Sequence, residues 1–110
     1  MKSFFPPVLT IILSGFLLAP GLLLSTERTG EQVYMLWCDG CHMDSPFAPG
    51  TIQLRQMRGQ DKGLIRERKD LSADYIRQIV RQGQNGMPLF RRTEISATEL
   101  EDLVEYLVDN

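Results

Sequence analysis

The sequence predicts a small all-α domain of three or four helices joined by long loops. Apolar residues recur at helical spacing behind good N-caps, and no stretch alternates as a half-buried strand would. The chain has only two cysteines and one histidine, and all three lie within five consecutive residues. The hydrophobic core of a domain of this size is only marginally stable, so the domain is expected to need additional stabilisation from a metal or a cofactor.

The first 26 residues form a segment of their own, separate from a domain over residues 27–110. A positive charge at Lys2 precedes an apolar run from Phe4 to Leu24, which is typical of a secretory signal peptide. Prolines interrupt the run, so it suits a membrane anchor of roughly 20 apolar residues less well. Cleavage after the small residues around Ala19 and retention as an anchor both stay open, and both place the domain in the periplasm.

The domain is expected to begin with a helix from about Gly30 to Cys41. Thr29 and Gln32 have the spacing of a capping box, and the apolar residues after them recur at helical spacing. The stretch from Met43 to Gly63 shows no period and contains two prolines and three glycines, which predicts a loop. A short helical turn is expected from Leu64 to Lys69.

Two more helices are predicted in the second half of the chain. Ser72 is a good N-cap for an apolar stripe that ends at Gly83. Ser96 and Glu99 form a second capping box before the clearest amphipathic pattern in the sequence. Residues 84–93 between them are expected to be a loop. Loops this long do not suit an ordinary helical bundle, and they do suit a chain that wraps a large apolar group.

The residues with distinctive chemistry are Cys38-Asp39-Gly40-Cys41-His42, which have the Cys-x-x-Cys-His spacing of a covalent haem attachment site. Each thiol would add to one vinyl group at the porphyrin edge, and the adjacent imidazole would then reach the iron. A redox dithiol needs a preceding strand and a sheet, which the sequence does not predict. A structural zinc site needs four Cys or His ligands, and a disulfide between these cysteines would close almost no loop.

The second axial ligand of the iron must be another residue type, because the chain has no second histidine. The candidates are Met35, Met43, Met57 and Met87, followed by Lys62 and Lys69. Met43 directly follows His42 and cannot reach the opposite face of the ring. Met87 is favoured, because it lies between Gly86 and Pro88 in a loop presented by one helix and held by the next. His/Met ligation raises the haem potential and suits electron transfer.

Charge is segregated along the domain. Residues 55–92 hold ten basic and four acidic residues, and residues 93–110 hold six acids and no base. No basic run is interleaved with aromatic residues, so a nucleic-acid partner is not expected. The basic half is either an ordinary solvated surface or a docking face for an acidic partner. Arg55 and Arg58 are also candidates to pair with the haem propionates.

Together these features resemble the single-haem class I cytochromes c over Thr29 to Val108. The likeness rests on Gly30 and Tyr34 before the attachment motif, Pro49 after it, Gly86-Met87-Pro88, and the last helix with Tyr106. It implies a small class I cytochrome c-like domain of three to four helices wrapped around one covalent haem c, with His42 and Met87 on the iron. It also implies that Gly30 and Tyr106 meet where the first and last helices cross. The carbonyl of Pro49 would then accept the other N–H of His42.

A narrower likeness, carried by residues 71–76, 79–83 and 87–90, is to the cytochrome subunits of p-cresol methylhydroxylase-type flavocytochromes. It implies an electron carrier, without a catalytic cycle of its own. This carrier would take single electrons from a periplasmic flavin-dependent dehydrogenase and pass them to a downstream respiratory acceptor. The sequence departs from that group in a longer, basic stretch from Gly50 to Asp70. The alternative is a haem enzyme, gas-binding protein or sensor with an open sixth iron position, against which Met87 argues.

Overall fold

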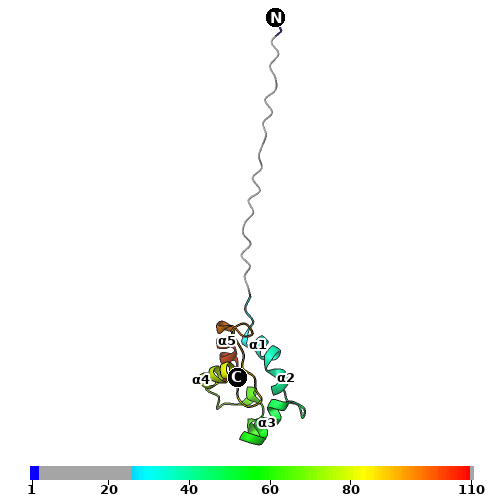
Figure 1. The fold of residues 1–110 in the computed structure, drawn as a ribbon, viewed down its shortest axis with the longest axis vertical. Helices are drawn as coiled ribbons and strands as arrows, with labels where there is room; N and C mark the ends of the chain where they lie inside the picture. Colours follow the sequence, from blue (N-terminus) through cyan, green and yellow to red (C-terminus); the bar gives the residue numbers. More distant parts are fainter. Residues whose placement is uncertain (3–25, 110) are drawn as a thin grey trace.

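The computed structural model describes residues 1–2 and 26–109, so most of the predicted signal or anchor segment lies outside the described residues. Within them the chain forms five α-helices, two 3-10 turns and no β-strand (Figure 1). The helices are α1 (Gly30–Trp37), α2 (Asp39–His42), α3 (Pro49–Arg58), α4 (Ala73–Gln82) and α5 (Ala97–Val108), and the 3-10 turns are η1 (Gln60–Lys62) and η2 (Ile65–Glu67). The all-α prediction is confirmed, but the described residues form five helices where three or four were expected, because the first predicted helix is divided at Cys38 and α3 was not predicted. In this part of the chain, no helix has both the length and the apolar character needed to cross a membrane.

The helix predicted from Gly30 to Cys41 is present but interrupted once. α1 ends at Trp37 and α2 begins at Asp39, with Cys38 between them at φ −110° and ψ −41°. The N–H of Cys38 still donates to the carbonyl of Tyr34 at 2.8 Å, so the break is slight. Because of this break, Cys41 and His42 lie on a separate short helix, α2.

The loop predicted from Met43 to Gly63 is wrong in its second half, where α3 runs from Pro49 to Arg58. Pro49 occupies the first turn of the helix, where its missing N–H is not needed and its fixed φ suits helical backbone. Prolines in this stretch indicated a loop from the sequence, and Pro49 begins a helix instead. α3 then stops at Gly59, whose φ is +113°.

The second half of the chain follows its sequence pattern. α4 begins after Ser72, whose hydroxyl accepts a hydrogen bond from the N–H of Tyr75. α5 begins after Ser96 with both bonds of the predicted capping box. η2 falls inside the turn predicted over residues 64–69, and residues 83–96 join α4 to α5 without a helix.

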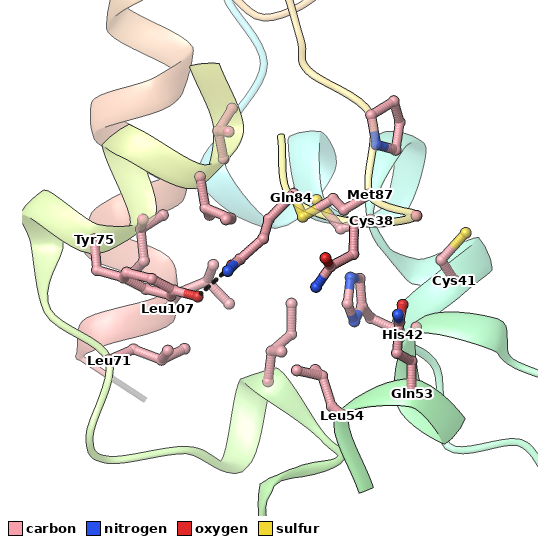
Figure 2. A pocket seen from close by; sticks show the side chains of 18 of the residues that line it. Cys38, Cys41, His42, Gln53, Leu54, Leu71, Tyr75, Gln84, Met87 and Leu107 are labelled. Atoms are coloured by element: carbon pink, nitrogen blue, oxygen red, sulfur yellow. Dashed lines mark hydrogen bonds between the residues drawn. The ribbon is translucent and has the colours of Figure 1, made fainter. Parts of the chain in front are cut away.

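The core lies where α5 packs against α1 and α4 (Figure 1). α1 crosses α5 at Gly30, where a Cβ would overlap the backbone carbonyl of Asp102 and meet the Cβ of Tyr106. Tyr34 is fully buried, with its ring centroid 5.8 Å from that of Tyr106. The predicted crossing is therefore present, and it depends on the missing side chain of Gly30. Beside this core the helices leave a cavity, whose wall Figure 2 shows.

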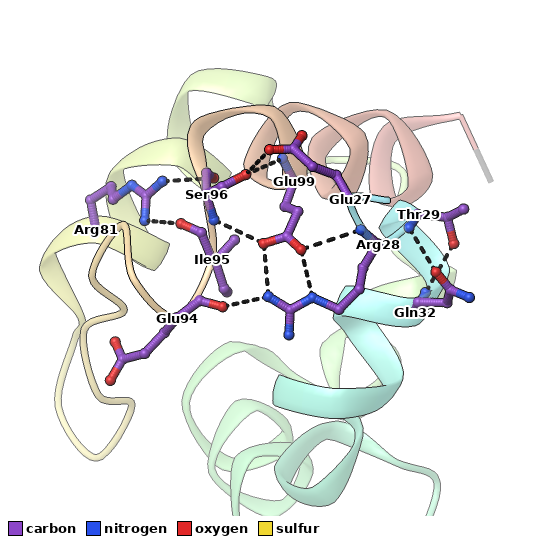
Figure 3. Close-up of polar contacts among 9 residues, drawn as sticks. All are labelled: Glu27, Arg28, Thr29, Gln32, Arg81, Glu94, Ile95, Ser96 and Glu99. Atoms are coloured by element: carbon purple, nitrogen blue, oxygen red, sulfur yellow. Dashed lines mark hydrogen bonds and ion pairs between the residues drawn. The ribbon is translucent and has the colours of Figure 1, made fainter. Parts of the chain in front are cut away.

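A partly buried ion pair joins the segment before α1 to the start of α5 (Figure 3). The Glu99 side chain is 7% exposed and accepts hydrogen bonds from the Arg28 guanidinium and from the N–H of Ser96. Arg28 also donates to the carbonyl of Glu94 at 2.7 Å. The Arg28 hydrogen bond is the main cause that lowers the pKa of Glu99 to about 2.

Glu99→Gln should lower the free energy of unfolding of the haem-loaded protein by about 1–3 kcal/mol at pH 7, because Arg28 loses its carboxylate partner. The folded-state pKa of Glu99 lies below its ordinary value of 4.5. Its contribution is therefore complete above about pH 4.5 and is lost as the pH falls toward 2. Denaturant unfolding should show the difference between wild type and Glu99→Gln shrinking across that window.

Glu101→Gln is the matched control for this pair. Glu101 binds Arg77 on the surface and is 55% exposed, so its loss should lower the free energy of unfolding less than the loss of Glu99 does. Equal losses in the two variants would contradict the anchoring role of Glu99.

Candidate functional site

The cavity beside the core is bounded by residues from all five α-helices and from the loop after α4. Its volume is about 240 Å³, and most of the side chains that line it are apolar. Cys38, Cys41 and His42 lie together in its wall (Figure 2). These three residues, which are close in sequence, thus line an apolar cavity whose other walls come from the rest of the domain.

His42 is the last residue of α2, and its imidazole lies in the cavity wall (Figure 2). Its Nδ1 is buried and has no hydrogen-bond partner in the described part of the chain. Burial also lowers the pKa of His42, so the ring is neutral near pH 7 and can offer a nitrogen lone pair to a metal. A Cβ on Gly50 would lie 2.7 Å from Cε1 and 2.9 Å from Nδ1 of this ring, so α3 fixes its position closely.

Two side chains hold the backbone at His42 and the residue after it. The Tyr34 hydroxyl donates to the carbonyl of His42 at 3.4 Å, and the Thr51 hydroxyl donates to the carbonyl of Met43 at 2.8 Å. Pro49 lines the cavity, but no hydrogen bond joins its carbonyl to Nδ1 of His42. The expected contact of Pro49 is therefore absent, and α3 instead presents the neighbouring Gly50 to the imidazole.

Both cysteines are free thiols. Cys38 is 7% exposed, and burial is the main cause that raises the pKa of its thiol to about 12. A dithiol redox centre needs a thiol with a lowered pKa, so thiol–disulfide exchange does not fit this site. No cluster of three or more Cys, His, Asp or Glu side chains suitable for a metal occurs among the described residues.

Two of the four candidate methionines reach the cavity. Met57 on α3 and Met87 in the loop after α4 line it, whereas Met35 and Met43 do not. Met87 is partly buried against the core, and Met57 is 56% exposed. Figure 2 shows the Met87 side chain extending into the cavity from a segment other than the one that carries His42. The lysine candidates, Lys62 and Lys69, are not among the lining residues.

The arginine predictions are only partly in accord with the geometry. Arg55 does not line the cavity, and its guanidinium lies 3.2 Å from the carboxylate of Asp44. Arg58 lines the cavity as expected. Arg68 lines it too, which no local sequence pattern indicated, and it binds Asp70 at 2.7 Å with its side chain 12% exposed.

The sequence did not indicate four further polar side chains in the wall: Gln53, Tyr75, Gln84 and Asn85. Tyr75 belongs to the apolar stripe that was predicted to end at Gly83, and its ring does face the cavity. Its hydroxyl, however, donates to Oε1 of Gln84 at 3.2 Å (Figure 2). Only the folded backbone brings these two residues together.

A neutral, half-buried histidine beside two free cysteines at an apolar cavity fits a covalently bound haem. The porphyrin ring needs apolar surroundings, the thiols match its two vinyl groups, and the iron takes an imidazole nitrogen. The fold and this site define a c-type cytochrome.

The chain belongs to the family described as cytochrome c oxidase, cbb3-type, subunit III, whose model matches residues 25–107. A curated relative is a cytochrome c6-like protein from Nostoc sp., 27% identical over 92 residues, which are 84% of this chain and 78% of the relative. The protein is therefore a member of the electron-carrying cytochromes c and binds one covalent haem c.

Two crystal structures of p-cresol methylhydroxylase contain a chain with this fold. One was determined with substrate bound, and its matched chain has a TM-score of 0.51 at 25% identity, covering 73% of this chain and 89% of the other. The second has a TM-score of 0.53 at 27% identity and covers 76% and 96%. The likeness to the cytochrome subunits of such flavocytochromes is confirmed.

Proposed function

We propose that this protein is a periplasmic carrier that takes single electrons from a flavin-dependent dehydrogenase and delivers them to the respiratory chain. Cys38 and Cys41 hold the haem, and His42 and Met87 ligate its iron. The observation that carries the proposal is that these four residues, from two segments far apart in the sequence, line one apolar cavity. When bound, the haem supplies the one-electron exchange between ferric and ferrous iron.

The lining residues suit a carrier better than an enzyme. Arg58 and Arg68 are the only charged side chains of the described lining residues, and no carboxylate is among them. The cavity therefore offers no carboxylate to act as a general acid or base. Apolar surroundings and a thioether ligand both favour the ferrous state, so the protein raises the potential of the haem.

The two lining arginines suit the haem propionates. Arg68 is held by Asp70, which fixes the direction of its guanidinium. Arg58 is exposed and forms no ion pair with any described residue. Arg58 and Arg68 therefore replace Arg55 and Arg58 as the proposed propionate partners.

A flavoprotein donor is supported by the likeness to a chain of p-cresol methylhydroxylase. Few of the basic residues in the range 55–92 have charged groups that are available to attract such a donor. Arg81 is occupied, because its guanidinium donates to the backbone carbonyls of Phe90, Ile95 and Ser96. Arg91 and Arg92 are exposed, and their guanidinium groups pair with no described carboxylate. These two arginines are the proposed steering charges for an acidic donor.

The test is the rate at which a reduced flavin-dependent dehydrogenase with an acidic docking face reduces the haem. The second-order rate constant should fall as salt rises, because exposed charges are screened beyond about 8–10 Å. The Arg91→Gln/Arg92→Gln double variant should flatten this salt dependence. Arg77→Gln is the control, since Arg77 is already neutralised by Asp74 and Glu101.

A rate constant that does not change with salt would contradict the steering role of Arg91 and Arg92 and would mean that they are ordinary solvated surface residues. A haem that no flavoprotein or small one-electron donor can reduce would contradict the carrier role itself and favour a haem-dependent sensor.

A further inference from the structure

A side-chain hydrogen bond in the cavity wall ties the turn that carries Met87 to α4. Tyr75 lies in the first turn of α4, and Gln84 lies just beyond the end of that helix. The Tyr75 hydroxyl donates to Oε1 of Gln84 at 3.2 Å, and both side chains line the cavity with Met87 (Figure 2). The bond therefore links the first turn of α4 to the residue at which the following turn begins.

Gln84 and Met87 move together because their backbones are joined directly. The N–H of Gln84 donates to the carbonyl of Met87 at 3.1 Å, and the N–H of Met87 donates to the carbonyl of Gln84 at 2.9 Å. Only Asn85 and Gly86 separate them, and Asn85 has a φ of +52°, in the left-handed region that few residues adopt. Because the turn is short and is closed by two hydrogen bonds, a contact that fixes the position of Gln84 also fixes the position of Met87.

Few other hydrogen bonds hold this turn. Before it, the N–H of Gly83 donates to the carbonyl of Ile79, and after it, the N–H of Phe90 donates to the carbonyl of Val80, both at 2.8 Å. Among the described residues, no other side-chain hydrogen bond reaches residues 84–88. Gly86 is loosely packed, because a Cβ placed on it would meet only Oε1 of Gln53, at 3.6 Å.

We propose that Tyr75 is a positioning residue for the Met87 ligand and acts through Gln84. The inference rests on the proposed function, in which Met87 ligates the iron. A thioether is a weak ligand, so the protein must hold the sulfur in place in both oxidation states. The Tyr75–Gln84 hydrogen bond keeps the turn closed and so slows the release of Met87.

The competing explanation is that Tyr75 only packs. Its ring lies on the apolar side of α4 and is 38% exposed, so the hydroxyl could be dispensable. Tyr75→Phe distinguishes the two explanations, because it keeps the ring and removes only the hydrogen bond. Gln84→Leu removes the other partner while keeping a side chain of similar size.

The experiment measures imidazole binding to the oxidised, haem-loaded protein at saturating imidazole, where release of the native ligand limits the rate. Each single variant should bind imidazole about five times faster, as loss of one hydrogen bond predicts. The double variant should be no faster than either single variant, because one bond is lost in each case. Gln78→Ala is the control: it removes the exposed hydrogen bond from Gln78 to Gln82 on the same helix and should leave the rate unchanged.

An unchanged rate in Tyr75→Phe would overturn the inference and leave the ligand assignment intact, provided the wild type shows the sulfur-to-iron charge-transfer band. Multiplied effects in the double variant would show that the two residues act separately, which would overturn the coupling through Gln84. A wild type without that band would overturn both this inference and the His/Met ligation on which it rests.

Discussion

Met87→Ala is expected to abolish the sulfur-to-iron charge-transfer band of the oxidised protein and to let carbon monoxide bind the reduced haem. The haem potential should fall by on the order of 100 mV, because a thioether favours ferrous iron and water does not. Met57→Ala is the matched control, since Met57 lines the same cavity from α3 but is 56% exposed. It should leave the band, the potential and carbon monoxide binding as they are in the wild type.

Two outcomes would change the assignment in different ways. If Met57→Ala removes the band and Met87→Ala leaves it, the ligand is Met57 and the carrier role survives. If the wild type binds carbon monoxide freely and has no band, the sixth iron position is open. The protein would then be a haem enzyme, gas-binding protein or sensor.

The covalent attachment should depend on Cys38 and Cys41 together. After boiling and denaturing electrophoresis, the wild type should keep haem stain at its own band, because thioether bonds survive unfolding. Cys38→Ala and Cys41→Ala should each retain at most one thioether and lower the yield of stained protein. The double variant should lose the stain completely. Trp37→Phe serves as the control, since it changes a neighbouring lining residue and keeps both thiols.

Haem stain that leaves the wild-type band on boiling would contradict covalent attachment. A stain retained in the double variant would mean that neither thiol holds the cofactor. His42 could still be an iron ligand in that case, so a spectrum of the folded protein would be needed beside the gel.

The features that the sequence determined by itself are those with local causes. The capping boxes at Thr29 and Ser96 need only a side chain and the backbone three residues away, and both are present as predicted. The apolar stripes of α4 and α5 likewise reflect the helical repeat alone. The haem motif was recognisable because its three reactive side chains are neighbours in the chain, so their spacing needs no knowledge of the fold.

Tertiary structure decided which distant side chains reach the cavity. Met57 and Met87 line it and Met35 and Met43 do not, which depends on how α3 and the turn after α4 pack around the core. Arg68 faces the cavity, while Arg55 pairs with Asp44 and Arg81 binds backbone carbonyls. A charged residue in a sequence does not show which partner it will meet, because that partner lies far along the chain. The Tyr75–Gln84 hydrogen bond has the same origin: it exists only where a helix and the following turn bring the two side chains within 3.2 Å.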